Sequence, residues 1–203
     1  MSEVHVKSPI LNVSGQQIVP HSGNIIQCNY VRSDTLTTFI YSYREYYEST
    51  NQNFPIKLRL DNVSNPNNWV MCQWQMSGES NSQSNFGFYV LKNGSFIPRG
   101  AGSGPGDGNP GTGQYWMHHQ GGGYDGDDSS TPHTMFFTYF GKIGQVGSVE
   151  YTLRFADGGG NDCTYYMNRT VSSAGANNYE NGVSVGVIYE LGGDVGTSSL
   201  SGL

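Results

Sequence analysis

The side chains best suited to chemistry gather in one glycine-rich stretch, residues 99–132. Imidazoles and carboxylates recur there within a few positions, and hard cations need several oxygen ligands close together. The weak metal-ligand candidates are His118, His119, Asp125, Asp127 and Asp128, with Asp107 and His133 nearby. Residues 124–129 lack the distal glutamate of an EF-hand loop. A solvated acidic loop tip or a subunit contact is therefore the favoured interpretation, with a structural metal site as the alternative, and no cofactor is assigned.

Three aromatic residues in the same stretch could contact a ligand or a neighbouring subunit. They are Tyr115, Trp116 and Tyr124. Flat aromatic faces next to Asn, Asp and Gln suit the stacking of sugars, but Tyr and Trp are also enriched at protein interfaces. We favour the subunit interface and keep glycan binding as the alternative.

No motif of catalysis is present. The chain has no GxSxG, no HExxH and no Walker-type loop, and the glycines of 100–113 are not closed by a lysine. The three cysteines, Cys28, Cys72 and Cys163, each lie inside a strand-like run, which predicts buried reduced thiols rather than metal or redox chemistry. We therefore expect a protein that is not an enzyme.

The composition of the chain favours strands and excludes several classes of partner. Glycine accounts for 29 of 203 residues, and charged residues make up only 13%, which is unlike a helical protein. Aromatic residues at 13% supply a core. The net charge of −6 without a basic cluster argues against nucleic acid. No apolar run approaches the ~18 residues of a membrane span, and the first residues do not resemble a signal peptide, so we expect no membrane insertion and folding in a cytosol.

Short runs of alternating polarity, bounded by turn residues, predict about nine strands and no helix. Residues 78–84 are expected to be a polar loop, and Asn93-Gly94 is a strong signal for a type I′ hairpin turn. The fold class predicted is all-β, an antiparallel β-sandwich of jelly-roll type. The expected strands cover residues 25–30, 37–47, 56–61, 70–76, 86–92, 135–140, 149–156, 163–168 and 184–191, and residues 95–97 start a short return strand that Pro98 closes early.

The chain divides into an arm, one domain and a tail. Residues 1–22 are predicted to form an extended N-terminal docking arm, residues 23–191 the sandwich with its long loop 99–132, and residues 192–203 a flexible C-terminal tail. The apolar residues of the arm that could dock on a partner are Val4, Val6, Ile10, Leu11, Val13 and Ile18.

Seven segments in order give the chain a resemblance to a known family. They are residues 23–27, 68–71, 88–94, 136–140, 151–155, 166–169 and 187–191. In their order and spacing they resemble small tail-fibre-like or virion-surface proteins of tailed phages, of the type common among phages of marine bacteria and cyanobacteria. The arm before Gly23 and the loop 99–132 depart from that pattern.

The resemblance implies a jelly-roll-like sandwich on a phage particle rather than an activity. We expect a non-enzymatic virion structural protein, a tail-fibre or receptor-facing component attached by its arm and assembled in the host cytoplasm. Its expected partners are further copies of itself, with a homotrimer preferred, other phage particle proteins and host surface glycans. The alternatives are a capsid decoration protein and a free, lectin-like carbohydrate-binding module.

Overall fold

The structure is a computed structural model, and it describes residues 25–41, 54–80, 85–97, 116–120, 132–157, 163–172 and 181–193. Every regular element among them is a β-strand, and every strand pair is antiparallel. Nothing in this part of the chain forms a helix of the length and hydropathy that crossing a membrane requires. The all-β antiparallel prediction is confirmed, while the jelly-roll type stays a prediction. The arm 1–22 lies outside the described residues.

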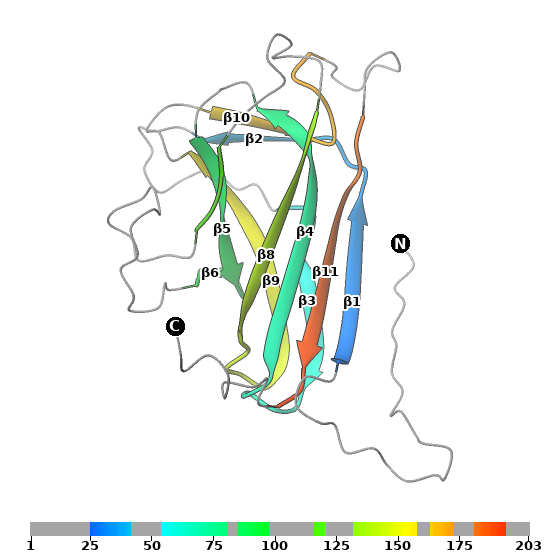
Figure 1. The fold of residues 1–203 in the computed structure, drawn as a ribbon, viewed down its shortest axis with the longest axis vertical. Helices are drawn as coiled ribbons and strands as arrows, with labels where there is room; N and C mark the ends of the chain where they lie inside the picture. Colours follow the sequence, from blue (N-terminus) through cyan, green and yellow to red (C-terminus); the bar gives the residue numbers. More distant parts are fainter. Residues whose placement is uncertain are drawn as a thin grey trace, which may run out of the picture.

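The strands form two sheets (Figure 1). The first sheet has the order β1-β11-β4-β10-β2, and β8 pairs with the other edge of β4. Its strands are β1 (Ile25–Ser33), β11 (Ser184–Leu191), β4 (Trp69–Ser80), β10 (Cys163–Met167), β2 (Thr37–Tyr41) and β8 (His133–Lys142). The second sheet has the order β3-β9-β5-β6, with β7 also on β5. Its strands are β3 (Leu58–Val63), β9 (Gly147–Asp157), β5 (Asn85–Lys92), β6 (Ser95–Phe96) and β7 (Trp116–Gln120).

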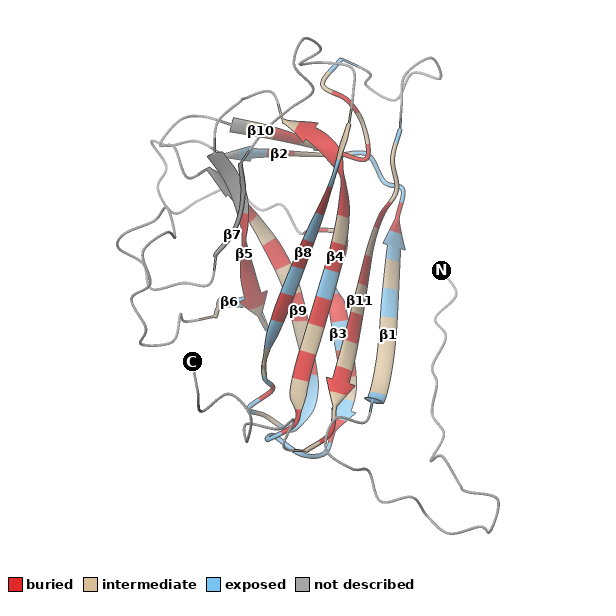
Figure 2. Ribbon diagram, viewed as in Figure 1, coloured by how far each residue is buried: buried red, intermediate tan, exposed pale blue. Residues whose placement is uncertain are grey.

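One hydrophobic core joins the two sheets. The ring of Phe88 from β5 lies 5.1 Å from that of Phe137 on β8 and 5.7 Å from that of Tyr165 on β10, centroid to centroid. All three side chains are buried, as are the inward residues of β4, β9 and β11, and buried positions alternate along these strands in Figure 2. Two sheets that share an interdigitated core in this way form a sandwich.

Glycine lets the sheets approach closely at one point of this core. A Cβ at Gly186 of β11 would lie 2.6 Å from Ile56 Cγ2 and 2.8 Å from Leu58 Cδ2, inside van der Waals contact. The inward position between Val185 and Val187 therefore carries no side chain.

The hairpin between β5 and β6 confirms the predicted turn. Asn93 and Gly94 have φ of 49° and 77°, the two positive values of a type I′ turn, and Lys92 pairs with Ser95 across it.

Three sequence expectations are wrong. β4 continues through residues 78–80, where a loop was expected, because these residues pair with β10 and a Cβ at Gly78 would meet the Tyr166 carbonyl oxygen at 2.3 Å. Gly78 is thus required by close packing between strands and not by a turn. The stretch 99–132 contains the strand β7, paired along β5, and the described residues hold eleven strands rather than about nine.

Candidate functional site

The predicted metal candidates fall on different parts of the fold. His118 and His119 lie in β7, opposite Gly87 and Phe86 of β5 in the second sheet. His133 begins β8 in the first sheet, opposite Gly78. Asp107, Asp125, Asp127 and Asp128 lie outside the described residues. Among the residues that the structure does describe, no three His, Cys, Asp or Glu side chains form a group that could hold a metal ion.

The predicted glycan or subunit contacts are placed only in part. The backbone of Trp116 begins β7 and is the register partner of Tyr89. Tyr115 and Tyr124 lie outside the described residues, as do the six apolar residues of the arm: Val4, Val6, Ile10, Leu11, Val13 and Ile18. The aromatic cluster therefore stays a prediction.

A different surface stands out, the outer side of the first sheet. Alternation buries Val70, Cys72, Trp74 and Met76 of β4, and their neighbours consequently face away from the core. The same alternation on β1, β11 and β8 completes a four-stranded surface, which we call the aromatic face. Its residues are Ile25, Cys28, Tyr30 and Arg32 of β1; Val185, Val187, Tyr189 and Leu191 of β11; Trp69, Met71, Gln73 and Gln75 of β4; and Phe136, Thr138, Phe140 and Lys142 of β8.

Strand register lines these residues up in rows. Met71 stands between Tyr189 and Phe140, and Gln73 stands between Val187 and Thr138. Residues directly opposite one another in an antiparallel pair share a face and lie within contact distance. Each row is thus built from sequence segments far apart in the chain.

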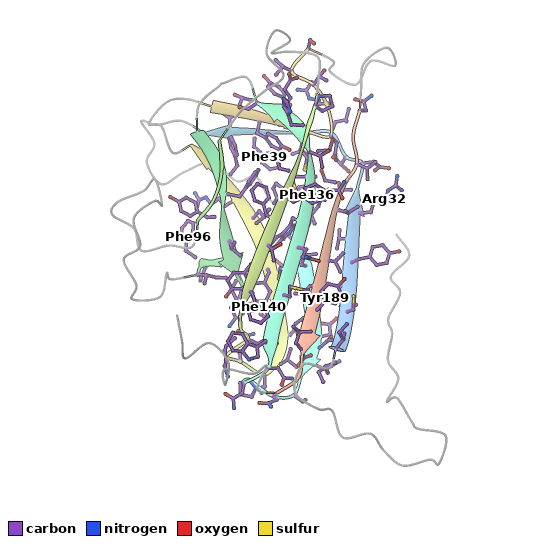
Figure 3. The ribbon with its side chains drawn as sticks, viewed as in Figure 1. Arg32, Phe39, Phe96, Phe136, Phe140 and Tyr189 are labelled. Atoms are coloured by element: carbon purple, nitrogen blue, oxygen red, sulfur yellow. The ribbon has the colours of Figure 1, made fainter. Side chains whose placement is uncertain are left out.

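Aromatic rings on this face are stacked and open to solvent. The rings of Trp69 and Phe140 lie 4.8 Å apart and 12° from parallel, and Lys142 Nζ is 5.0 Å from the Trp69 ring centroid. Phe136 is 73% exposed, the highest exposure among the large hydrophobic side chains of the described residues. Figure 3 shows Phe136 and Phe140 along β8 and Tyr189 on β11.

The aromatic face carries positive charge only. Its two charged residues, Arg32 and Lys142, lie on opposite edge strands, and it contains no Asp or Glu. Glu190 lies between two of its residues on β11 but points inward and is 1% exposed. The Glu190 carboxylate accepts hydrogen bonds from Asn68 Nδ2 at 2.5 Å and from Gln27 Nε2.

Three buried titratable groups beneath this face, one thiol and two phenols, are held in their protonated, neutral form. Burial raises the pKa of the Cys72 thiol well above its ordinary value and also raises that of the Tyr151 and Tyr165 phenols. The expectation of a buried reduced thiol is confirmed for Cys72, whereas Cys28 is a free cysteine only half-buried on the aromatic face. Thiols and phenols held in this state do not supply a nucleophile at neutral pH.

Sequence reasoning missed the aromatic face, although one signal for it was available. Residues 136–140 read Phe-Phe-Thr-Tyr-Phe, which places aromatic side chains on both faces of a strand. An ordinary half-buried strand alternates apolar and polar residues. A strand that is apolar on both sides indicates a second contact surface beyond the core.

Comparison with known proteins assigns no family to this geometry. No protein-family model matches the chain, and no curated protein matches its sequence. The aromatic face, rather than a relative, carries the functional argument.

Proposed function

We propose that this chain is a non-enzymatic structural protein of a phage virion and that the aromatic face packs against another protein of the particle. The observation that supports this is a sheet surface, four strands wide, that exposes several large aromatic and aliphatic side chains and carries no acidic one. Monomeric proteins rarely expose apolar patches of more than a few hundred Å², and larger ones mark contact surfaces.

The residue types on the aromatic face match those of protein interfaces. Tyr, Trp, Phe, Met and Arg are enriched at interface cores, and Lys, Glu and Asp are depleted there. Met71 and Tyr189 lie near the middle of the face, whereas Trp69 shares an end row with Lys142 and Arg32 lies in the row at the opposite end. The outer face of a sheet also accepts a second sheet at the usual packing distance of ~10 Å.

The position in the particle follows from the resemblance rather than from the fold. A tail-fibre or receptor-facing component, attached through residues 1–22 and assembled in the host cytoplasm, is the form proposed here, and a capsid decoration protein is the alternative. Both roles require self-association and contacts with other particle proteins. The homotrimer stays a prediction.

A second candidate function is a free carbohydrate-binding module. The observation that favours it is the placement of exposed rings beside side-chain amides, with Phe140 46% exposed and Gln73 and Gln75 on the neighbouring strand. Sugar rings stack on aromatic faces, while amides hydrogen-bond to their hydroxyl groups.

The test is incorporation of the full chain into particles. A phage lacking this gene is complemented with the wild-type chain, with Tyr189→Lys, or with Ser148→Lys, and the particles are purified and probed with an antibody against the chain. Tyr189 is central on the aromatic face, whereas Ser148 is exposed on the outer side of β9 in the second sheet. We expect incorporation of the wild type and Ser148→Lys and loss of Tyr189→Lys.

Two results would contradict the proposal. The first is a wild-type chain that never sediments with particles, and the second is equal incorporation of both variants. A glycan array separates the lectin alternative, because that function predicts glycan binding by the free chain, lost in Tyr189→Lys, without any particle.

A further inference from the structure

The strand β8 presents a long, regular edge. Among the described residues it pairs only with β4, through a ladder that runs from Trp69–Lys142 to Gly78–His133 without a register shift. The ten residues of β8 thus present a regular row of backbone groups on the side of the strand that faces away from β4. A regular edge of this kind is a template for pairing with another strand.

The other long edges of the sandwich carry features that discourage pairing. β1 has a register shift between Ile25 and Gln27 and presents Arg32 near its end. The edge of β3 is covered by side chains of β1: Gln27 Nε2 donates to the Asp61 carbonyl at 2.9 Å, and Asn29 Nδ2 donates to the Arg59 carbonyl at 2.7 Å. Bulges, charges and covering groups are the ordinary means of protecting edge strands.

β8 has none of these features along its central residues. Its exposed side chains are Thr134, Phe136, Thr138 and Phe140, and its one lysine, Lys142, is the last residue of the strand. β-Branched and aromatic residues favour strand pairing, and no proline interrupts them. Unlike the edges of β1 and β3, the edge of β8 therefore lacks protection against pairing with another strand.

We propose that the partner is a second copy of this chain, paired antiparallel through β8 about a two-fold axis at Thr138. In this register Phe136 of each copy stands opposite Phe140 of the other, and Thr138 stands opposite its own equivalent. On the inner side, Phe137 stands opposite Tyr139 and Met135 opposite Gly141. Aromatic residues therefore meet aromatic residues on both faces of the strand.

The sequence of β8 selects this register among its neighbours. A shift by one residue would oppose outward to inward side chains and is excluded. The next register that keeps the faces matched has its axis at Phe137 and sets each exposed phenylalanine opposite a threonine. Only the axis at Thr138 pairs the two exposed aromatic residues, Phe136 and Phe140, with each other, and its ladder of residues 134–142 is as long as that of the Phe137 register.

Charge also fits a second copy. The register places Lys142 opposite Thr134, so that no two like charges meet directly, and Arg32 lies at the far edge of the sheet on β1. Like charges directly opposite one another destabilise a strand pair. A two-fold pairing of β8 would join two four-stranded outer surfaces into one continuous aromatic face.

This inference goes beyond the proposed function, because it concerns the edge of the sheet and does not require a virion. A two-fold contact closes on itself and gives assemblies with an even number of chains. The homotrimer expected from the sequence is a competing outcome of the same measurement.

The test compares substitutions on neighbouring strands of one row. Thr138→Lys puts two lysines opposite each other across the proposed axis. Gln73→Lys is the matched control, since Gln73 is the register partner of Thr138 on β4, is also exposed, and lies one strand away from the edge. The mass of each full-length chain in solution is measured by light scattering after gel filtration over a 100-fold range of concentration, with circular dichroism to establish folding.

The expected result is an even multiple of the 22.1 kDa of one chain for the wild type and Gln73→Lys, with pairing weakened at least 10-fold in Thr138→Lys. Thr138→Asp alone is expected to behave in the same way. An equimolar mixture of Thr138→Lys and Thr138→Asp is expected to restore the pairing, because opposite charges then meet across the axis. This rescue keeps the test independent of any loss of stability in one variant.

Several outcomes would overturn the inference. They are a wild-type mass of one or three chains throughout, equal weakening by Gln73→Lys and Thr138→Lys, or no recovery on mixing the two charged variants. None of them bears on incorporation into particles, which depends on Tyr189 at the centre of the aromatic face. The proposed function and this inference can therefore fail separately.

Discussion

The outer sides of the two sheets differ in how they meet water. Two ion pairs lie on the outer side of the second sheet: Lys57 Nζ, just before β3, is 3.6 Å from Glu150 Oε1 of β9, and Arg59 Nε is 2.8 Å from Asp61 Oδ1 within β3. Ser148 Oγ adds a hydrogen bond of 3.0 Å to Asp61. The aromatic face of the first sheet has stacked rings instead, and its two cations have no acidic residue beside them on that face.

The difference shows that packing in the core determines the residue types on only one face of each sheet. Both sheets bury their inward residues in the same core, and both are built from the same antiparallel pairing. The core does not constrain the types of the outward residues. Those types therefore indicate what each face contacts. The β3–β9 side is suited to solvent, and the aromatic face is suited to a further surface.

The largest effect should come from the core on which both faces rest. Phe88 is fully buried, and its ring lies within 5.1 to 5.7 Å of the rings of Phe54, Phe137, Phe155 and Tyr165. We expect Phe88→Ala to lower the free energy of unfolding by about 3–5 kcal/mol through lost burial and a cavity. Urea unfolding, read as a lower midpoint at unchanged slope, measures this loss.

The control for this prediction is Phe136→Ala on the aromatic face. Because Phe136 is 73% exposed, its removal should change the free energy of unfolding by no more than about 0.5 kcal/mol when measured on the monomer. Similar losses in the two variants would show that the aromatic face contributes to the fold rather than awaiting a partner.

The second effect tests whether both sheets enclose one dry interior. Burial raises the pKa of Cys72 in the first sheet and of Tyr151 in the second, above ordinary values of 9.0 and 10.0. These groups stay protonated in the folded chain while the unfolded chain releases their protons. Stability is therefore fully present below about pH 8 and is lost as the pH rises through the ordinary pKa values of the unfolded chain, by about 2–4 kcal/mol between pH 8 and 10.5.

Urea unfolding at a series of pH values, with reductant present, checks this slope. Cys72→Val, which removes one of the titrating groups, should show a shallower decline than the wild type. A free energy of unfolding that stays flat to pH 10.5 would mean that water reaches these groups in the folded chain.

Much of the fold could be predicted from the sequence because the signals are local. The strand over 184–191 was placed at its observed bounds, and the turn at Asn93-Gly94 follows from two residues that tolerate positive φ. β7 was missed because five residues set among glycines give no sustained alternation. Gly78 resembles a loop residue in its own segment. The contact that requires glycine there comes from Tyr166, on a strand nearly ninety positions later, and gives no local signal.

The candidate site was harder to predict because it depends on strand order. Tyr189, Met71 and Phe140 form one row only through the pairing of β11, β4 and β8, and nothing in their own segments gives that order. The residues of unusual type in the stretch 99–132 are a stronger local signal than any residue of the aromatic face. The aromatic face consists of ordinary strand residues. They form a candidate site only because their side chains point to the same side of the sheet.

The third effect measures how much the aromatic face contributes to its own stability. Phe140→Ala removes the ring stacked on Trp69 at 4.8 Å and should cost about 0.5–1.5 kcal/mol at protein concentrations low enough to keep the chain monomeric. Thr138→Ala, two residues earlier on the same side of β8, is the control and should cost less. A loss above about 3 kcal/mol would indicate that Phe140 belongs to the core.

The smallest effect concerns the ion pair on the opposite side of the sandwich. Lys57 and Glu150 are both partly exposed, so their coupling should be about 0.2–1 kcal/mol and should fall as salt screens it. A double-mutant cycle with Lys57→Met and Glu150→Gln, run in 0.02 M and 1 M NaCl, measures that coupling by urea unfolding. The coupling between Trp69 and Phe140, measured in the same two buffers, should keep its value because stacking does not depend on net charge. A Lys57–Glu150 coupling that resists salt would mean that this pair is shielded from solvent, and the β3–β9 side would then also count as a covered surface.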